Sequence, residues 1–256
     1  MYKHLGKDEY QRFLNLPENY VVDGFIVIGG HPKDKEYPHL YEALEFLALP
    51  YAEEKIEERF FGDIKSLRIG SKRIWFDVAY GAAYLSEVAH LACLFGSKAN
   101  ILLGTCGALR GNLNTGDTIL PSSSYGNESA THMYQRENTM FVYDADPTLR
   151  GKIKMHLSQR ATIDEGRLVT VQAMLAETKE DVDLWAREGY SGVDMESATF
   201  FAVSNHFNVP SAALLLVADN LVRNELVGDI GYEALRAQRT AIRKENYQIA
   251  LKTLLD

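Results

Sequence analysis

Short apolar runs alternate with helix-periodic stretches along the chain. The apolar run at 25–28 ends at two glycines and predicts a buried strand that leads into a loop. Similar runs predict strands at 101–103, 118–121, 168–171 and 212–217, of which the last is the most apolar. Near-continuous apolar strands have to be covered on both faces, so the pattern favours an α/β fold with helices on both sides of a sheet.

Helical periodicity separates these strands. In residues 84–96, for example, apolar side chains recur at the three- and four-residue spacing of one helix face. Residues 64–70 and 73–79 alternate polar and apolar side chains and predict a hairpin. The other predicted helices lie around 40–47, at 147–160, 180–189 and 197–207, and at about 230–254. Neither a repeat nor a linker interrupts the pattern, so we expect a single domain over 1–256.

The composition narrows the classes of function. The 256 residues are 46% hydrophobic, enough for a sizeable core, and carry a formal net charge of −8. An acidic chain is a poor binder of nucleic acid, because phosphate backbones need a basic surface. The sequence shows neither a signal-like N-terminus nor an apolar stretch of about 20 residues, and Cys93 and Cys106 form no disulfide or metal-spaced pattern. We therefore expect a soluble cytoplasmic protein with no membrane or nucleic-acid partner, no metal and no cofactor.

Three unusual segments follow predicted strands, where ligands bind in sheets of this kind. The first segment, 104–107, reads Gly-Thr-Cys-Gly. Its glycines permit close approach of the backbone, and exposed N–H groups together with the Thr105 hydroxyl can hold an anion. The alternative is a tight turn without a ligand, which is common for paired glycines.

The other two segments supply carboxylates. Asp194 and Glu196 lie where an apolar stretch passes into a predicted helix. An acid there either caps the helix or reaches into a cleft, where a carboxylate can accept both vicinal hydroxyls of a ribose. Asp219 follows the most apolar strand, and partial burial there raises a carboxyl pKa toward the range of a general acid. The alternative for Asp219 is a helix cap.

Together these segments resemble the nucleoside phosphorylase/nucleosidase family. Residues 101–121 are similar to its Gly-Thr/Ser-x-Gly-Ala turn with the following Gly-Asp and strand, and residues 189–219 to its Met-Glu signature, helix and strand ending in an acid. The resemblance covers roughly 75–255. It implies a three-layer α/β/α fold with a central mixed, largely parallel sheet, cleavage of the N-glycosidic bond of a purine nucleoside or nucleotide, and a homo-oligomer (dimer or hexamer).

The resemblance also implies roles for single residues. Glu196 would hold the ribose 2′ and 3′ hydroxyls, Met195 would line the sugar pocket, and Asp219 would protonate or hydrogen-bond N7 of a departing purine. The other residues placed around the substrate are Gly30, Thr105 and Gly107 at the anion or water, Met174 beside the base, His132 near the ribose 5′ end, and Arg59 as a residue donated by a neighbouring subunit.

Three positions depart from the phosphate-dependent members. Leu102 and Asp34 stand where those enzymes have arginines that clamp orthophosphate, and Ala218 stands where a serine precedes the acid. The absence of arginine at Leu102 and Asp34 favours hydrolysis, as in the short AMP nucleosidases that the chain resembles. Ala218 instead removes a hydroxyl that would orient Asp219, and together with the missing arginines it motivates a non-catalytic alternative. The alternatives are a phosphate-dependent purine nucleoside or uridine phosphorylase, with orthophosphate as co-substrate, and a non-catalytic nucleoside-binding protein.

Overall fold

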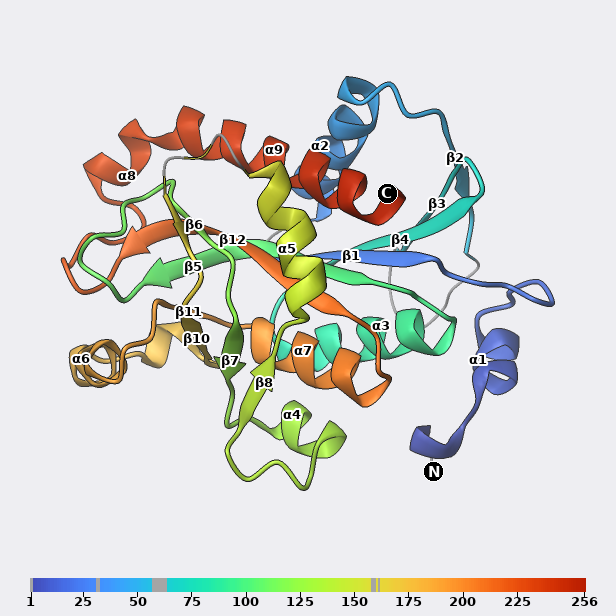
Figure 1. Ribbon diagram of the computed structural model, residues 1–256, viewed down its shortest axis with the longest axis horizontal. Helices are drawn as coiled ribbons and strands as arrows, with labels where there is room; N and C mark the ends of the chain where they lie inside the picture. The colour runs from blue at the N-terminus through green and yellow to red at the C-terminus, as the bar shows by residue number, and fades with distance from the viewer. Residues whose placement is uncertain (1, 31–32, 57–63, 158–159, 161) are drawn as a thin grey trace.

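The strands of the chain form one mixed sheet that carries helices on both faces (Figure 1). This computed structural model describes residues 2–30, 33–56, 64–157, 160 and 162–256. The sheet follows the order β2-β3-β4-β1-β5-β11-β10-β7-β8, and β12 lies against β5 and β6. The expected three-layer α/β/α fold is therefore confirmed.

Four parallel strands at the centre of the sheet position the site. They are β4 (Lys72–Ala79), β1 (Gly24–Gly29), β5 (Asn100–Ala108) and β12 (Ser211–Asn220), and each pairs in parallel with the next. Their carboxyl ends meet at one edge of the sheet, where ligands bind in open α/β folds. The remaining strands are β2 (Tyr51–Glu54), β3 (Lys65–Ile69), β6 (Thr118–Ile119), β7 (Ser123–Tyr125), β8 (Val142–Asp144), β9 (Ile163–Asp164), β10 (Arg167–Thr170) and β11 (Gly192–Asp194).

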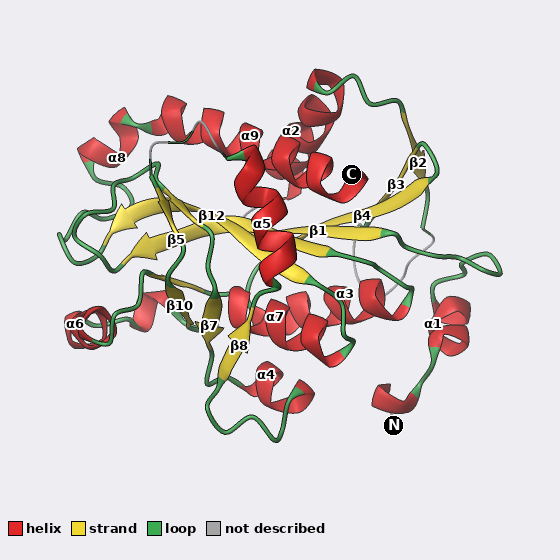
Figure 2. Cartoon of the chain, in the orientation of Figure 1, coloured by secondary structure: helices red, strands yellow, loops and turns green. Residues whose placement is uncertain are grey.

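Two helical layers cover the sheet (Figure 2). One layer contains α2 (Lys33–Phe46), α5 (Pro147–His156) and α9 (Arg236–Leu255), and the other contains α3 (Ala82–Leu94) and α7 (Ser197–His206). The remaining helices are η1 (Tyr2–His4), α1 (Lys7–Phe13), α4 (Ser129–Tyr134), η2 (Met174–Ala176), α6 (Lys179–Arg187) and α8 (Ile230–Ala234). Adjacent residues of a strand face opposite sides, so Trp75 joins the core under α3 and α7 while Phe76 joins the core under α2 and α9.

The sequence-based expectation was wrong about the kind of structure at 104–107 and about the continuity of the last helix, while other elements, such as α2 (Lys33–Phe46) and α5 (Pro147–His156), differ from it only at their ends. The glycine segment 104–107 is not a turn, because β5 continues through it to Ala108. This segment pairs with β12 and, at its end, with β11, and the two ladders hold the glycines in extended conformation. The expected helix at 230–254 is divided at Leu235 into α8 and α9.

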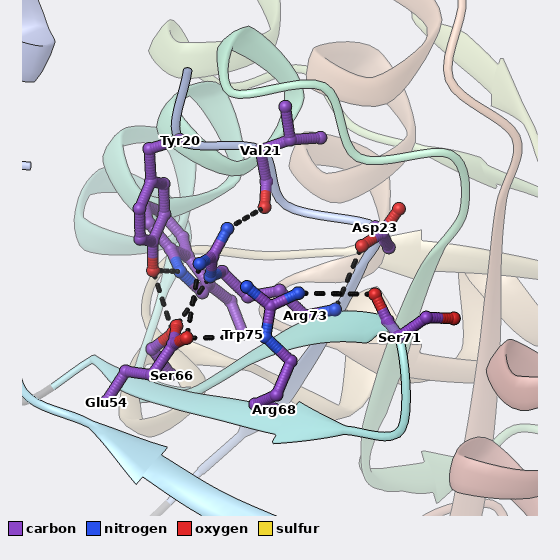
Figure 3. Close-up of polar contacts among 9 residues, drawn as sticks. All are labelled: Tyr20, Val21, Asp23, Glu54, Ser66, Arg68, Ser71, Arg73 and Trp75. Atoms are coloured by element: carbon purple, nitrogen blue, oxygen red, sulfur yellow. Dashed lines mark hydrogen bonds and ion pairs between the residues drawn. The ribbon is translucent and has the colours of Figure 1, made fainter. Parts of the chain in front are cut away.

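A polar cluster ties the segment before β1 to β3 and β4 (Figure 3). The Arg73 guanidinium lies 3.8 Å from the centre of the Tyr20 ring and donates to Glu54 at 2.6 Å. The Tyr20 hydroxyl in turn lies 2.7 Å from the Ser66 hydroxyl and accepts from Nε1 of Trp75 at 2.9 Å. The cluster lies at the amino end of β1, so it stabilises the strand from the end opposite to the candidate site.

Candidate functional site

The turn from β11 into α7 presents two buried carboxylates. Asp194 ends β11 and accepts the N–H of Ser197 at 2.9 Å, so it caps the first turn of α7 as one sequence-based alternative proposed. Glu196 lies two residues further on and is 6% exposed. Because the two side chains point in different directions from the turn, Asp194 serves the helix while Glu196 faces the edge of the sheet.

Glu196 brings three elements together. Its Oε1 accepts the N–H of Gly81, between β4 and α3, at 2.7 Å. Its Oε2 faces the end of β1, where a Cβ on Gly29 would come within 2.8 Å of it. Any larger residue at that position would therefore displace the Glu196 carboxylate. Burial and the nearby Asp194 carboxylate raise the pKa of Glu196.

Asp219 lies beside Gly107 at the carboxyl end of β12. The register between β12 and β5 shifts between Val217 and Asp219, and after this bulge Asp219 pairs with Gly107. A Cβ on Gly107 would lie 3.2 Å from Oδ1 of Asp219. The other oxygen, Oδ2, accepts the N–H of Val227 at 3.3 Å, and burial raises the pKa of Asp219 to about 6.

A pocket opens between the ends of β1, β5 and β12 on the side of α2 and α9. Its wall includes Gly30 and Thr105, as well as Glu36 from α2 and Arg243 and Tyr247 from α9. Glu36 is 3% exposed, and its two oxygens accept from Arg243 Nη1 at 2.9 Å and from the Tyr247 hydroxyl at 2.7 Å. A carboxylate with a neutralising guanidinium thus faces the segment that was expected to hold an anion.

A second ion pair lies on the other side of β1. Asp77 is fully buried on β4, and Lys33 from the start of α2 lies 2.9 Å from its Oδ1. The Tyr84 hydroxyl donates to Oδ2 of Asp77 at 2.6 Å. Burial raises the pKa of Asp77, while the hydrogen bonds from Tyr84 and Lys33 act against that rise. The charge of Lys33 is therefore balanced by a buried acid.

The structure brings together some of the residues that the sequence singled out. Gly30 and Thr105 share the pocket wall, and Gly107 adjoins Asp219. Glu196 adjoins Gly29, which itself lines the pocket.

Other expected residues lie further out. Met195 is partly buried, and Met174 is 52% exposed in η2. His132 lies on α4, where its ring stacks on Phe141 at 4.7 Å and its Nε2 is 3.1 Å from Asn127. Arg59 lies outside the described residues, as does His31.

Three arginines of α9 contact groups other than Asp219. Arg243 pairs with Glu36, and Arg236 pairs with Glu233 at 2.8 Å. Arg239 donates to the carbonyl oxygen of Tyr232. Within the described residues, none of these contacts involves Asp219. The Asp219 side chain instead accepts a hydrogen bond from the backbone N–H of Val227.

Sequence reasoning missed Glu36 and Asp77. Glu36 shares the buried face of α2 with Leu40 and Ala43, which follow at helical spacing, so the periodicity placed an acid on the inward face. Asp77 stands inside a strand whose neighbours on both sides are apolar and buried. Buried acids are rare unless they are paired, so either position was a detectable signal.

A comparison with models of protein families identifies the family of this chain. The model described as Phosphorylase superfamily matches residues 25–254. The chain belongs to the Phosphorylase superfamily. The match spans all of the pocket wall described above and every strand except the first residue of β1, Gly24.

Relatives within the superfamily are distant. A DeoD-type purine nucleoside phosphorylase of Geobacillus sp. (strain WCH70) is 24% identical over 196 residues, which are 77% of this chain and 79% of that protein. The structure of uridine phosphorylase from Vibrio fischeri ES114 superposes with a TM-score of 0.76 at 19% identity, covering 96% of this chain and 97% of the other. For the 5′-methylthioadenosine/S-adenosyl homocysteine nucleosidase of Campylobacter jejuni the TM-score is 0.72 at 13% identity, with 91% and 98% covered.

Membership confirms the expected enzyme class, that of nucleoside phosphorylases and nucleosidases, which cleave the N-glycosidic bond of nucleosides. The superfamily contains both phosphate-dependent and hydrolytic members, so membership alone leaves the attacking group open. Within the described residues, no helix has the length and apolar character needed to cross a membrane.

Proposed function

We propose that this enzyme hydrolyses the N-glycosidic bond of a purine nucleoside or nucleotide. The observation that carries the proposal is the Glu36 carboxylate in the pocket wall beside Thr105. An orthophosphate dianion bound there would face this buried acid, whereas a water molecule is compatible with it. The two described cations near the site, Lys33 and Arg243, are each paired with a buried acid and so supply no free clamp for phosphate.

The reaction breaks the bond between C1′ and N9, and positive charge develops on the ribose ring as in glycoside hydrolysis. We assign Glu196 to the 2′ and 3′ hydroxyls and Asp219 to N7 of the purine. Protonation at N7 neutralises the leaving base, and general acid help of this kind is worth roughly 10²–10⁴-fold. A pKa of about 6 keeps Asp219 within reach of this role near neutral pH.

The attacking water is assigned to the pocket at Thr105. Glu36 is the carboxylate of that pocket, and it is held in place by Arg243 and Tyr247. Such a fixed carboxylate can accept the proton that water loses as it attacks C1′. Glu196 and Glu36 then act on opposite parts of the sugar, one by anchoring it and the other by activating the nucleophile.

A purine nucleoside phosphorylase is the second candidate. It is favoured by the names of the relatives and by the presence of Arg243 in the pocket wall. In that case the Arg243 guanidinium would have to leave Glu36 for phosphate, at the expense of a buried ion pair.

The test is release of free base from AMP, adenosine, inosine and uridine, with and without orthophosphate. The proposal expects release from a purine substrate in the absence of phosphate. Strict dependence on phosphate would favour the second candidate, and the absence of release from every substrate, with binding retained, would favour a non-catalytic protein. AMP and adenosine are both included because the proposal covers nucleosides and nucleotides alike. The assay is run together with size-exclusion chromatography, because we also propose that the enzyme is a homo-oligomer.

A further inference from the structure

Asp194 is a buried carboxylate that the proposed reaction does not use. A network of hydroxyls surrounds it on β7, β10 and α7. The Thr170 hydroxyl donates to Oδ1 at 2.7 Å, and the Ser197 hydroxyl lies 3.0 Å from the same oxygen. The Ser124 hydroxyl closes the network at 2.9 Å from both Thr170 and Ser197.

The donors around Asp194 are those that suit an ionised carboxylate. Two hydroxyls approach Oδ1, and the N–H of Ser197 is 2.9 Å from Oδ2. A proton on either oxygen would displace one of these donors and leave it unsatisfied in a buried site. Asp194 therefore keeps its charge more easily than a bare buried acid does.

Glu196 is arranged differently. Its Oε1 receives the Gly81 N–H, while its Oε2 faces the Cα of Gly29. Glu196 thus has only backbone donors, the N–H groups of Gly81 and Met195, whereas Asp194 has two hydroxyls and an N–H. The charge of Asp194 disfavours a second charge on the neighbouring Glu196, and the hydrogen bonds around the two carboxylates assign the proton to Glu196.

The other ionisable groups around the pair do not compete for this proton. The Cys106 thiol on β5 is fully buried, and burial together with the charge of Asp194 raises its pKa, so it stays a thiol. On the side of β4 and α2, Asp77 is paired with Lys33 at 2.9 Å. Toward β12, Asp219 is turned to Gly107 and Val227.

We propose that Asp194 and Glu196 form a proton-linked latch that selects ribose over 2′-deoxyribose. In the empty site Asp194 holds the negative charge and Glu196 holds a proton. A ribose offers two hydroxyl donors, which compensate an ionised Glu196, so binding of a ribonucleoside releases the proton. A 2′-deoxyribose offers only one hydroxyl donor, so its binding releases a smaller fraction of a proton. Asp194 is in this sense a positioning residue that acts through Glu196.

The latch rests on the proposed role of Glu196 in ribose binding, but it can be tested by binding alone. Turnover is suppressed with the Asp219→Asn variant, and adenosine and 2′-deoxyadenosine are titrated calorimetrically in buffers of different ionisation enthalpy at pH 7. We expect release of close to one proton (about 0.5–1) for adenosine and clearly less for the deoxynucleoside. Asp194→Asn in the same background removes the neighbouring charge, which is the second cause of the raised Glu196 pKa after burial, so proton release should fall.

A second variant separates the latch from a merely structural effect. Glu196→Gln keeps one donor and one acceptor but cannot ionise, so it should bind adenosine without proton release at any pH. Equal proton release for the two nucleosides, or unchanged release in Asp194→Asn, would overturn the latch. If adenosine binds with the expected proton release while the wild-type enzyme frees no base, the proposed hydrolysis fails and the latch stands. If neither nucleoside binds, the latch is overturned, whereas the proposed hydrolysis is decided by the release assay with AMP and inosine.

Discussion

Oε1 of Glu36 lies 2.9 Å from Nη1 of Arg243, and this ion pair lines the pocket at the carboxyl ends of β1 and β5. The pair joins α2 to α9 across 207 residues of sequence. It also fixes a carboxylate beside Thr105, at the place where a phosphate-dependent enzyme would need an anion site. The proposed hydrolytic function depends most directly on this relationship.

Glu36→Gln should lower the rate of base release by roughly 10²-fold, because the amide cannot take the proton of the attacking water. The same change leaves Arg243 without its counter-charge and lowers stability. The double variant Glu36→Gln/Arg243→Gln should recover part of the stability but none of the activity, as steady-state kinetics and thermal melting would show. Recovery of activity in the double variant would mean that Glu36 only neutralises Arg243.

Asp219→Asn should reduce turnover by about 10²–10⁴-fold, because N7 of the leaving purine loses its proton donor. The wild-type rate should fall as the pH rises above the Asp219 pKa of about 6, and this basic limb should be absent from the variant. A pH profile of kcat/KM checks both statements. A basic limb that persists in Asp219→Asn would assign it to another group.

The same variant carries a stability prediction. The folded-state pKa of Asp219 is raised by burial above its unfolded value, so its contribution to stability is full below about pH 4 and is lost as the pH rises through about 6. Asp219→Asn should therefore be more stable than the wild type at pH 8, by about 1–3 kcal/mol, and no more stable at pH 4. Urea denaturation at the two pH values would show a constant difference if Asp219 does not titrate.

Gly29→Ala should weaken substrate binding without unfolding the chain. The added Cβ would lie 2.8 Å from Oε2 of Glu196, so the carboxylate has to move away from the ribose position. We expect KM to rise about tenfold or more, which corresponds to roughly 1.4 kcal/mol. Gly111→Ala is the matched control, since its Cβ would meet no atom within 4 Å. Equal effects of the two alanine substitutions on KM would show that Gly29 and Glu196 do not lie at the substrate site.

His90 should make the protein sensitive to acid. Its Nδ1 lies 2.9 Å from the Tyr134 hydroxyl, and burial together with the charge of His206 lowers its pKa to about 4. The fold favours neutral His90, so this stability is present above about pH 6.5 and is lost as the pH falls toward 4. Between pH 7 and pH 5, the free energy of unfolding should fall by about 1–2 kcal/mol less in His90→Gln than in the wild type.

The sequence predicted the main strands because they are continuous apolar runs. It predicted the segments that carry Glu196 and Asp219 because these acids stand at the spacing of the family signature. It misjudged the 104–107 segment, since two glycines resemble a turn while strand pairing on both sides keeps them extended. The partners of Glu36 and Asp77 were not predictable, because Arg243 and Lys33 reach them from distant parts of the chain. Such pairings depend on the packing of α2 against α9 and of α2 against β4.

The most direct test of hydrolysis is the identity of the sugar that is released. The wild-type enzyme is incubated with the purine substrate found in the release assay, in saturating orthophosphate, and the sugar product is identified by NMR. The hydrolytic function predicts free ribose, or ribose 5-phosphate from a nucleotide, in the same amount as the free base and at a rate that phosphate does not increase. A product phosphorylated at C1 would contradict it.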